Sequence, residues 1–179
     1  MSKKIAGQVI LSEETSREGT VYMTSSHVYK IFGKKANPYE NHYVWKTVEA
    51  QGVPIADTAK FTAEFEVGGK KSTVQGIRSQ RINWGRKFQF SKPGGEQILI
   101  NEIGKANNPA LLRLVLAGLE NAVKSGLTDP QGFIDVHHNP PLCFIDIHSR
   151  GSETLLAFAG AINAAKVQLA ELTGATQLR

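Results

Sequence analysis

The clearest pattern of apolar and polar positions is an alternation in the first half of the chain. Apolar residues occupy every second position from Phe61 to Val67, and the positions between them are polar. A period of two predicts a strand with one buried face and one solvated face. Gly68-Gly69 follows directly and predicts a two-residue hairpin turn. Residues 70–77 are therefore expected to form the return strand.

Further segments of the first hundred residues are rich in β-branched and aromatic residues, which favour strands. On this basis strands are predicted at residues 5–11, 20–24, 27–32, 43–48, 86–90 and 97–103. The last two are expected to pair through the turn signal Pro93-Gly94-Gly95.

Helical patterns begin only after residue 107. Asn108 suits an N-cap and Pro109 the first helical position, and an apolar stripe of period 3.6 follows until Gly126 ends the helix. A second helix is predicted after Ser152 as its cap. Its apolar stripe comprises Leu155, Phe158, Ile162, Ala165, Leu169 and Leu172. Residues 174–179 are predicted to fray.

The order of these elements predicts an α+β fold. An antiparallel N-terminal portion of about 6–8 strands precedes a helix, a β-hairpin at residues 133–148, and a C-terminal helix packed on the sheet. No long linker interrupts the chain, so residues 1–179 are predicted to form a single domain. The alanine-rich last helix also suits a partner helix. A homo-oligomer, or a structural or inhibitory protein that binds another protein, is therefore an open alternative.

Composition narrows the class of protein. With 41% hydrophobic and 21% charged residues the chain is typical of a globular protein. The single cysteine, Cys143, excludes an intramolecular disulfide and a multi-cysteine zinc site. It lies in an apolar strand, so we expect a core residue rather than a nucleophile. No apolar run approaches a signal sequence or the ~20 residues of a membrane span. We therefore expect a cytoplasmic protein without a membrane partner.

Positive charge is concentrated in one part of the chain, although the net charge is only +5. No acidic residue lies between Glu66 and Glu96. The basic stretch in that interval holds Lys70, Lys71, Arg78, Arg81, Arg86, Lys87 and Lys92. Such side chains neutralise phosphates and release counterions, which makes nucleic acid the expected partner.

Aromatic rings are interleaved with these cations. Trp84, and also Phe88 or Phe90, could stack on unpaired bases, and Gly85 permits a bend that exposes the indole. The alternative is that Phe88 and Phe90 form the core face of a strand, since they alternate with polar residues. The candidate nucleic-acid site is the seven cations together with Trp84.

One short resemblance accompanies this stretch. Residues 83–88, then Ile98 to Gly104, then a helix, resemble the strand–strand–helix run of Whirly and PUR-type single-strand binders, which implies single-strand binding. The resemblance covers about twenty residues and includes no invariant motif, and the part after Gly126 offers two strands where a second repeat needs four. The prediction therefore rests on charge and aromatic residues instead.

A second signal is an internal repeat, Phe133-Ile134-Asp135-Val136-His137, which recurs as residues 144–148. A symmetric hairpin places Asp135 opposite Asp146, with His137 and His148 nearby. Facing carboxylates repel one another, so the pair predicts a shared divalent metal or an acid–base pair. The alternative is a structural polar network in which Arg150 neutralises one Asp.

The leading hypothesis is a protein without enzymatic activity that binds single-stranded DNA or RNA and needs no cofactor. The rival is a metal-dependent phosphoesterase or nuclease that holds a divalent ion through Asp135, His137, Asp146 and His148.

Overall fold

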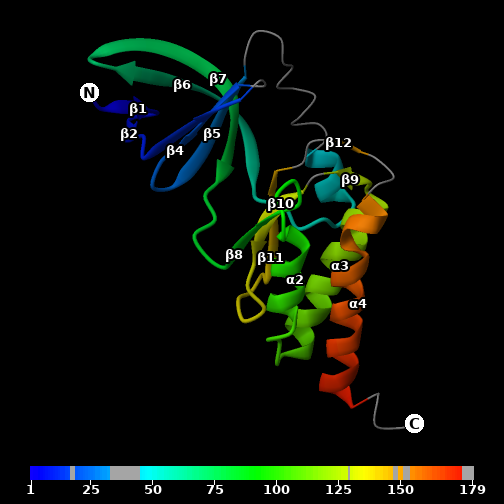
Figure 1. Ribbon diagram of the computed structural model, residues 1–179. Helices are drawn as coiled ribbons and strands as arrows, with labels where there is room; N and C mark the ends of the chain where they lie inside the picture. Colours follow the sequence, from blue (N-terminus) through cyan, green and yellow to red (C-terminus); the bar gives the residue numbers. More distant parts are fainter. Residues whose placement is uncertain (17–18, 33–44, 129, 147–148, 151–153, 175–179) are drawn as a thin grey trace. The chain divides into compact units, whose positions relative to one another are not determined.

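The computed structural model describes residues 1–16, 19–32, 45–128, 130–146, 149–150 and 154–174 (Figure 1). The chain groups into two compact units. The N-terminal unit comprises residues 1–46 and 56–82, and the C-terminal unit comprises residues 47–55 and 83–179. The predicted α+β class, with an antiparallel β-rich first part, is confirmed. Whether the two units unfold together, as a single domain would, stays a prediction.

The N-terminal unit contains a seven-stranded antiparallel sheet with the order β2-β1-β6-β7-β5-β4-β3. Its strands are β1 (Lys3–Ile5), β2 (Gln8–Val9), β3 (Ser12–Thr15), β4 (Gly19–Met23), β5 (His27–Phe32), β6 (Thr58–Val67) and β7 (Lys70–Gln80). The predicted hairpin through Gly68-Gly69 is confirmed, and β6 and β7 form the long curved ribbon in Figure 1.

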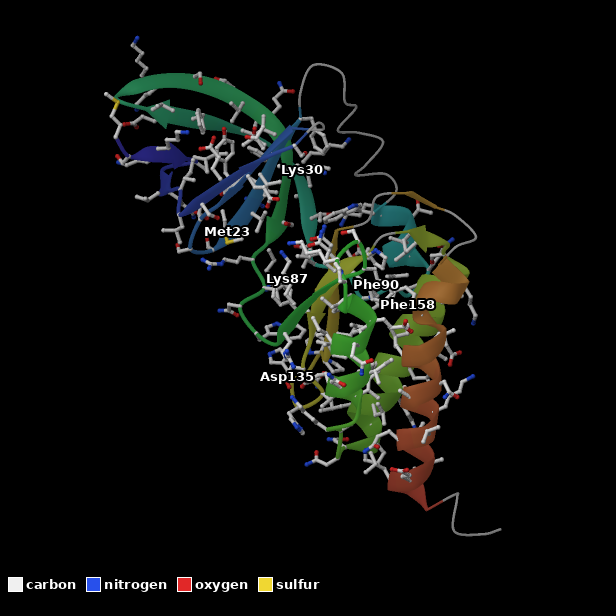
Figure 2. The ribbon with its side chains drawn as sticks, viewed as in Figure 1. Met23, Lys30, Lys87, Phe90, Asp135 and Phe158 are labelled. Carbon is white, nitrogen blue, oxygen red and sulfur yellow. The ribbon has the colours of Figure 1, made fainter. Side chains whose placement is uncertain are left out.

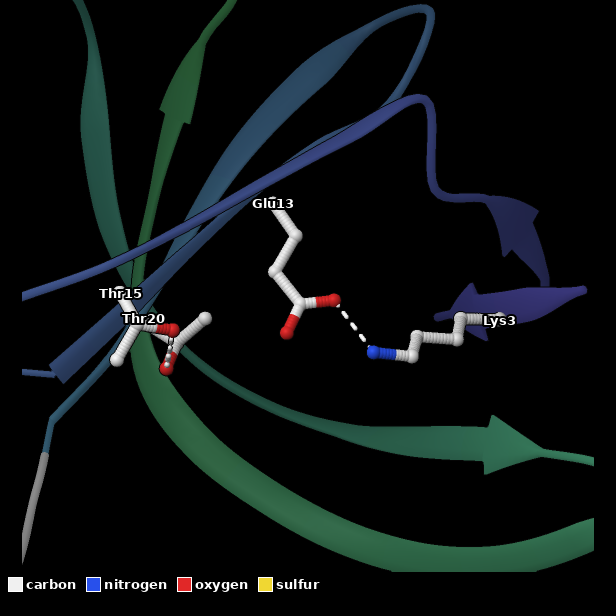
Figure 3. A network of polar contacts seen from close by, with 4 residues as sticks. All are labelled: Lys3, Glu13, Thr15 and Thr20. Atoms are coloured by element: carbon white, nitrogen blue, oxygen red, sulfur yellow. Dashed lines mark hydrogen bonds and ion pairs between the residues drawn. The ribbon is translucent and has the colours of Figure 1, made fainter.

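This sheet curls until its two ends meet. The N–H of Ile10 donates to the carbonyl of Lys3 at 3.0 Å, and the N–H of the next residue, Leu11, donates to the carbonyl of Met23 at 2.7 Å. The ammonium of Lys3 on β1 also pairs with the carboxylate of Glu13 on β3 (Figure 3), and this hydrogen bond raises the pKa of Lys3. Residues 10–11 therefore join the two end strands, β2 and β3, and bond to the strand next to each of them.

The curl also brings together aromatic rings from strands that are not neighbours. Tyr22 on β4 lies 5.1 Å from Phe65 on β6, and Tyr29 on β5 lies 5.0 Å from Phe61, measured between ring centroids. Phe61 and Phe65 are both on the apolar face that the alternation predicted. Of the four rings, Tyr29 is buried and the other three are half-buried, so they line the apolar face of the curled sheet.

The C-terminal unit combines two small sheets with three long helices (Figure 1). The three-stranded sheet has the order β11 (Leu142–Asp146), β10 (Gln131–Ile134), β8 (Arg86–Gln89), and β9 (Leu127–Thr128) pairs with β12 (Ser149–Arg150). The helices are α2 (Gly95–Ile103), α3 (Pro109–Lys124) and α4 (Thr154–Thr173). Residues 45–50, of which 47–50 belong to this unit, are also helical.

The predicted packing of the C-terminal helix on a sheet is confirmed. Phe158 of α4 is fully buried, and its ring lies 4.7 Å from the ring of Phe90 and 6.0 Å from that of Phe144 on β11. Phe90 and Phe158 are labelled in Figure 2. Of the helices described, none has the length and apolar character that a membrane crossing requires.

The first predicted helix starts as expected. The side chain of Asn108 accepts hydrogen bonds from the N–H groups of Ala110 and Leu111 at 3.0 and 3.3 Å, and Pro109 is the first helical residue. The helix ends at Lys124, and Gly126 follows with a φ of 66°. Ser152 and residues 175–179 lie outside the described residues.

Three strand predictions are wrong. Residues 97–103 belong to helix α2, residues 45–48 are helical, and Ala6-Gly7 divides the predicted strand 5–11 into β1 and β2. In α2 the buried Leu99 and Ile103 are one helical turn apart. A short apolar run fits a strand as well as a buried helix, so tertiary packing decides between them. The strand–strand–helix resemblance over residues 83–104 is not realised, because its second strand is a helix.

Candidate nucleic-acid interface

The basic stretch is divided between the two units, because the boundary lies between Ile82 and Asn83. The N-terminal unit holds Lys70, Lys71, Arg78 and Arg81. The C-terminal unit holds Trp84, Arg86, Lys87 and Lys92. Each half therefore has its own surroundings.

In the N-terminal unit two of the four cations are engaged by the fold. Lys71 forms an ion pair with Glu64 at 3.0 Å across the β6–β7 hairpin, and the hydrogen bond raises its pKa. The guanidinium of Arg81 donates to the carbonyl of the buried Thr24 at 3.0 Å. Arg81 therefore holds the chain after β7 against the end of β4, and its removal would disturb structure as well as charge.

The other two cations of this unit, Lys70 and Arg78, are exposed. Neither forms an ion pair with any residue in the described ranges. Both lie on even positions of β7, whereas Lys71 lies on the opposite face of the strand. Lys70 and Lys71 are adjacent in the sequence, but the strand places their side chains on opposite faces.

In the C-terminal unit the cations lie on and after β8, the strand at one edge of the three-stranded sheet. Arg86 and Lys87 are both exposed, and neither is in an ion pair within the part of the chain described. Successive residues of a strand point to opposite faces. On an edge strand, a ligand that follows the edge can contact both side chains. Lys92 is also exposed, in the connection between β8 and α2.

Trp84 precedes this strand and stacks on His138. The two ring centroids are 4.1 Å apart and the ring planes differ by 14°. The indole is half-buried, so it is neither a core side chain nor a free one. Sequence reasoning identified Trp84 but missed His138, because no local pattern connects residues so far apart along the chain.

Gly85 allows the chain to turn between Trp84 and β8. Its φ is 77°, a left-handed conformation that residues with a Cβ rarely adopt. A Cβ at this position would also lie 2.7 Å from the carbonyl oxygen of Ile134 on β10. The predicted bend is therefore present, and it places the Gly85 backbone against the end of β10, but the indole before it is half-buried and not exposed.

The two phenylalanines of the basic stretch are structural. Phe88 is 1% exposed, and its ring contacts that of Phe144 at 5.8 Å. Phe90 is half-buried and packs on Phe88 and Phe158. The alternative interpretation, that these rings form the core face of a strand, is confirmed for Phe88.

The predicted register of the repeated hairpin is wrong. Ile134 pairs with Leu142 and Gln131 with Asp146, so Asp135 follows the last pair of the ladder and does not face Asp146. The N–H of Asp135 donates to the carbonyl of Pro141 at 2.8 Å, which closes a wide loop in place of a symmetric turn. The repeat located the hairpin, but residues 135–137 of its first copy lie in the loop after β10 and not in a strand, and this loop sets the register.

In that loop Asp135 has a structural partner. Its carboxylate accepts the N–H of His137 at 2.9 Å, a local turn that aspartate commonly forms. His148 lies outside the described residues. Among the residues that are described, no three His, Cys, Asp or Glu side chains gather as a metal site would require. The metal hypothesis thus loses the facing carboxylates on which it was based.

Cys143 lies on β11 and is buried, as predicted for a core residue. Burial raises the pKa of its thiol to about 11. Since the thiolate is the reactive form, a pKa about two units above the ordinary value lowers the reactive fraction on the order of a hundredfold.

We expect Cys143 to react with an aromatic disulfide reagent at pH 8 on the order of a hundred times faster in urea-unfolded protein than in folded protein. The measurement is the rate of thiolate release by absorbance, with Cys143→Ser as the blank. Equal rates in the folded and unfolded protein would show an accessible thiol and contradict the buried position.

No protein-family model matches the chain, and a search of curated proteins finds no significant match.

Proposed function

We propose that the protein binds single-stranded nucleic acid through the C-terminal unit, along the edge strand β8. The observation that carries the proposal is the position of a half-buried indole, Trp84, two residues before a pair of exposed cations on the edge strand of the three-stranded sheet. Proteins that bind single strands combine cations that follow the phosphates with aromatic rings on which bases stack. Both components are present within three residues of one another along the chain.

The local balance of charge supports an anionic ligand. Arg86, Lys87 and Lys92 are exposed, and no acidic residue occurs between Glu66 and Glu96. Asp135 lies beside Gly85 in the fold. A Cβ added at Gly85 would be 3.3 Å from the Cβ of Asp135. Its carboxylate already accepts a backbone hydrogen bond. The edge therefore carries a net positive charge.

The salt dependence of binding tests this edge. Each phosphate contact on a single strand contributes ~0.7 to the slope of log K against log salt concentration. For the double variant Arg86→Ala/Lys87→Ala we expect the slope to flatten by about 1.4, since two contacts are lost. The measurement is fluorescence anisotropy of labelled oligo(dT) and oligo(U) at a series of salt concentrations.

The matched control is Arg113→Ala/Lys166→Ala. These residues are exposed on α3 and α4, and the change removes the same charge from helices, where alanine is well tolerated. The control should keep the wild-type slope. If it flattens the slope as much as the β8 variant does, binding responds only to net charge and the proposed site is wrong. A third variant, Lys70→Ala/Arg78→Ala, measures any contribution of the N-terminal unit.

A further inference from the structure

We propose that His138 positions the indole of Trp84 so that one unpaired base stacks on the indole face opposite His138. This inference rests on the proposed function and assigns a positioning residue and a ligand form to the same site. The near-parallel rings, 4.1 Å apart, are the geometry that carries it.

His138 is itself held in place at two points. Its backbone N–H donates to the carbonyl of Asp135 at 3.1 Å. Its ring Nδ1 lies 2.8 Å from the carbonyl oxygen of Pro140. A carbonyl only accepts hydrogen bonds, so Nδ1 must carry the proton and donate. The imidazole is therefore fixed in orientation by its own loop.

Trp84 depends on this ring for its position. The indole N–H makes no hydrogen bond to any residue in the described part of the chain. Gly85, the next residue, has no side chain that could hold the indole. The contact with His138 is the one aromatic contact that Trp84 makes among the described residues. We therefore expect removal of the imidazole to loosen the orientation of the indole.

The stack also selects the form of the ligand. With one indole face covered by His138, a base can stack only on the other face. A base inside a duplex already has both faces stacked, and its extrusion costs a few kcal/mol. A strand with unpaired bases meets no such cost. The ligand class is therefore a nucleic acid with at least one unstacked base beside the phosphates that Arg86 and Lys87 contact.

The test compares His138→Ala with His138→Phe on oligo(dT) and on the same strand made without bases. His138→Ala should weaken binding to oligo(dT) about two- to tenfold, the coupling typical of one aromatic pair. His138→Phe, which keeps a flat ring, should restore most of the affinity. On the strand without bases, His138→Ala and the wild type should bind equally. The salt slope should be unchanged throughout, since no phosphate contact is lost.

A readout in the free protein follows the indole directly. The chain has two tryptophans, and Trp45 is buried at 8% exposure, so acrylamide should quench mainly Trp84. His138→Ala should increase this quenching, and His138→Phe should not. The signal of Trp84 is isolated by subtracting that of Trp84→Phe.

The outcomes separate the two proposals. If wild-type protein binds no oligonucleotide, the proposed function fails. If it binds, and Arg86→Ala/Lys87→Ala flattens the salt slope while His138→Ala binds oligo(dT) as wild type does, the function stands and the positioning role is wrong. An equal loss on the strand without bases also overturns it. If His138→Ala does not fold, His138→Phe provides the test. A folded His138→Phe that binds no better than Trp84→Ala would overturn the positioning role.

Discussion

We expect Phe88→Ala to lower the free energy of unfolding by about 3–5 kcal/mol, the usual effect of removing a buried phenylalanine ring. The ring is 1% exposed and contacts Phe144 and Phe90. On the paired strand it lies over Gly132, where a Cβ would be 2.7 Å from the end of the ring. The backbone has no side chain at that point with which to fill the hole. The measurement is urea denaturation followed by circular dichroism.

Lys87→Ala is the matched control for this change, because it alters the adjacent, exposed position of the same strand. Its effect on stability should stay within about ±0.5 kcal/mol, as for most surface substitutions. The affinity of Phe88→Ala for oligo(dT) should match that of the wild type under conditions in which this variant is fully folded. A loss of less than about 1 kcal/mol in stability, or a loss of binding by the folded variant, would show that Phe88 is not a purely structural residue.

For Trp84→Ala we expect the opposite combination of effects. Affinity for oligo(dT) should fall by ~1–3 kcal/mol, the range measured for one base stacked on an aromatic side chain. Stability should change much less than in Phe88→Ala, because the indole is half-buried and contacts only the His138 ring among the aromatic residues described. Fluorescence anisotropy gives the affinity, and urea denaturation gives the stability.

Trp84→Phe serves as the comparison, since a smaller ring can still stack. It should bind oligo(dT) between the wild type and Trp84→Ala. A fall in stability of several kcal/mol with unchanged affinity in the folded protein would assign Trp84 to the core and remove it from the site. We thus predict that Phe88 contributes to stability alone and that Trp84 contributes mainly to binding, although the two residues lie in one short segment.

Local rules explain which elements could be predicted from the sequence. The alternation from Phe61 to Val67, with Gly68-Gly69 after it, required only a period of two and a turn that tolerates positive φ. Asn108 and Pro109 start α3 through hydrogen bonds to residues two and three positions away. In each case the stabilising partner is nearby in the sequence, so the local pattern is sufficient to predict the element.

The predictions that were wrong depended on residues distant in the sequence. Whether residues 97–103 form a strand or a helix depends on what covers Leu99 and Ile103, and those neighbours come from elsewhere in the chain. The hairpin register depends on the loop that Pro141 closes with Asp135. A shift of register changes every facing pair. The predicted opposition of Asp135 and Asp146 was lost for that reason.

The same distinction applies to the candidate site. By itself the sequence determined the α+β class, the position of the cations along the chain and the presence of an aromatic residue among them, because these follow from composition and local periodicity. Only the tertiary structure decided that Lys71 is paired with Glu64, that Arg81 holds Thr24, that Phe88 is in the core, and that Trp84 stacks on His138. Each of those partners is brought close by strand pairing or loop closure. The sequence states the chemistry of each side chain, but contacts between distant segments determine whether that side chain has a partner in the fold.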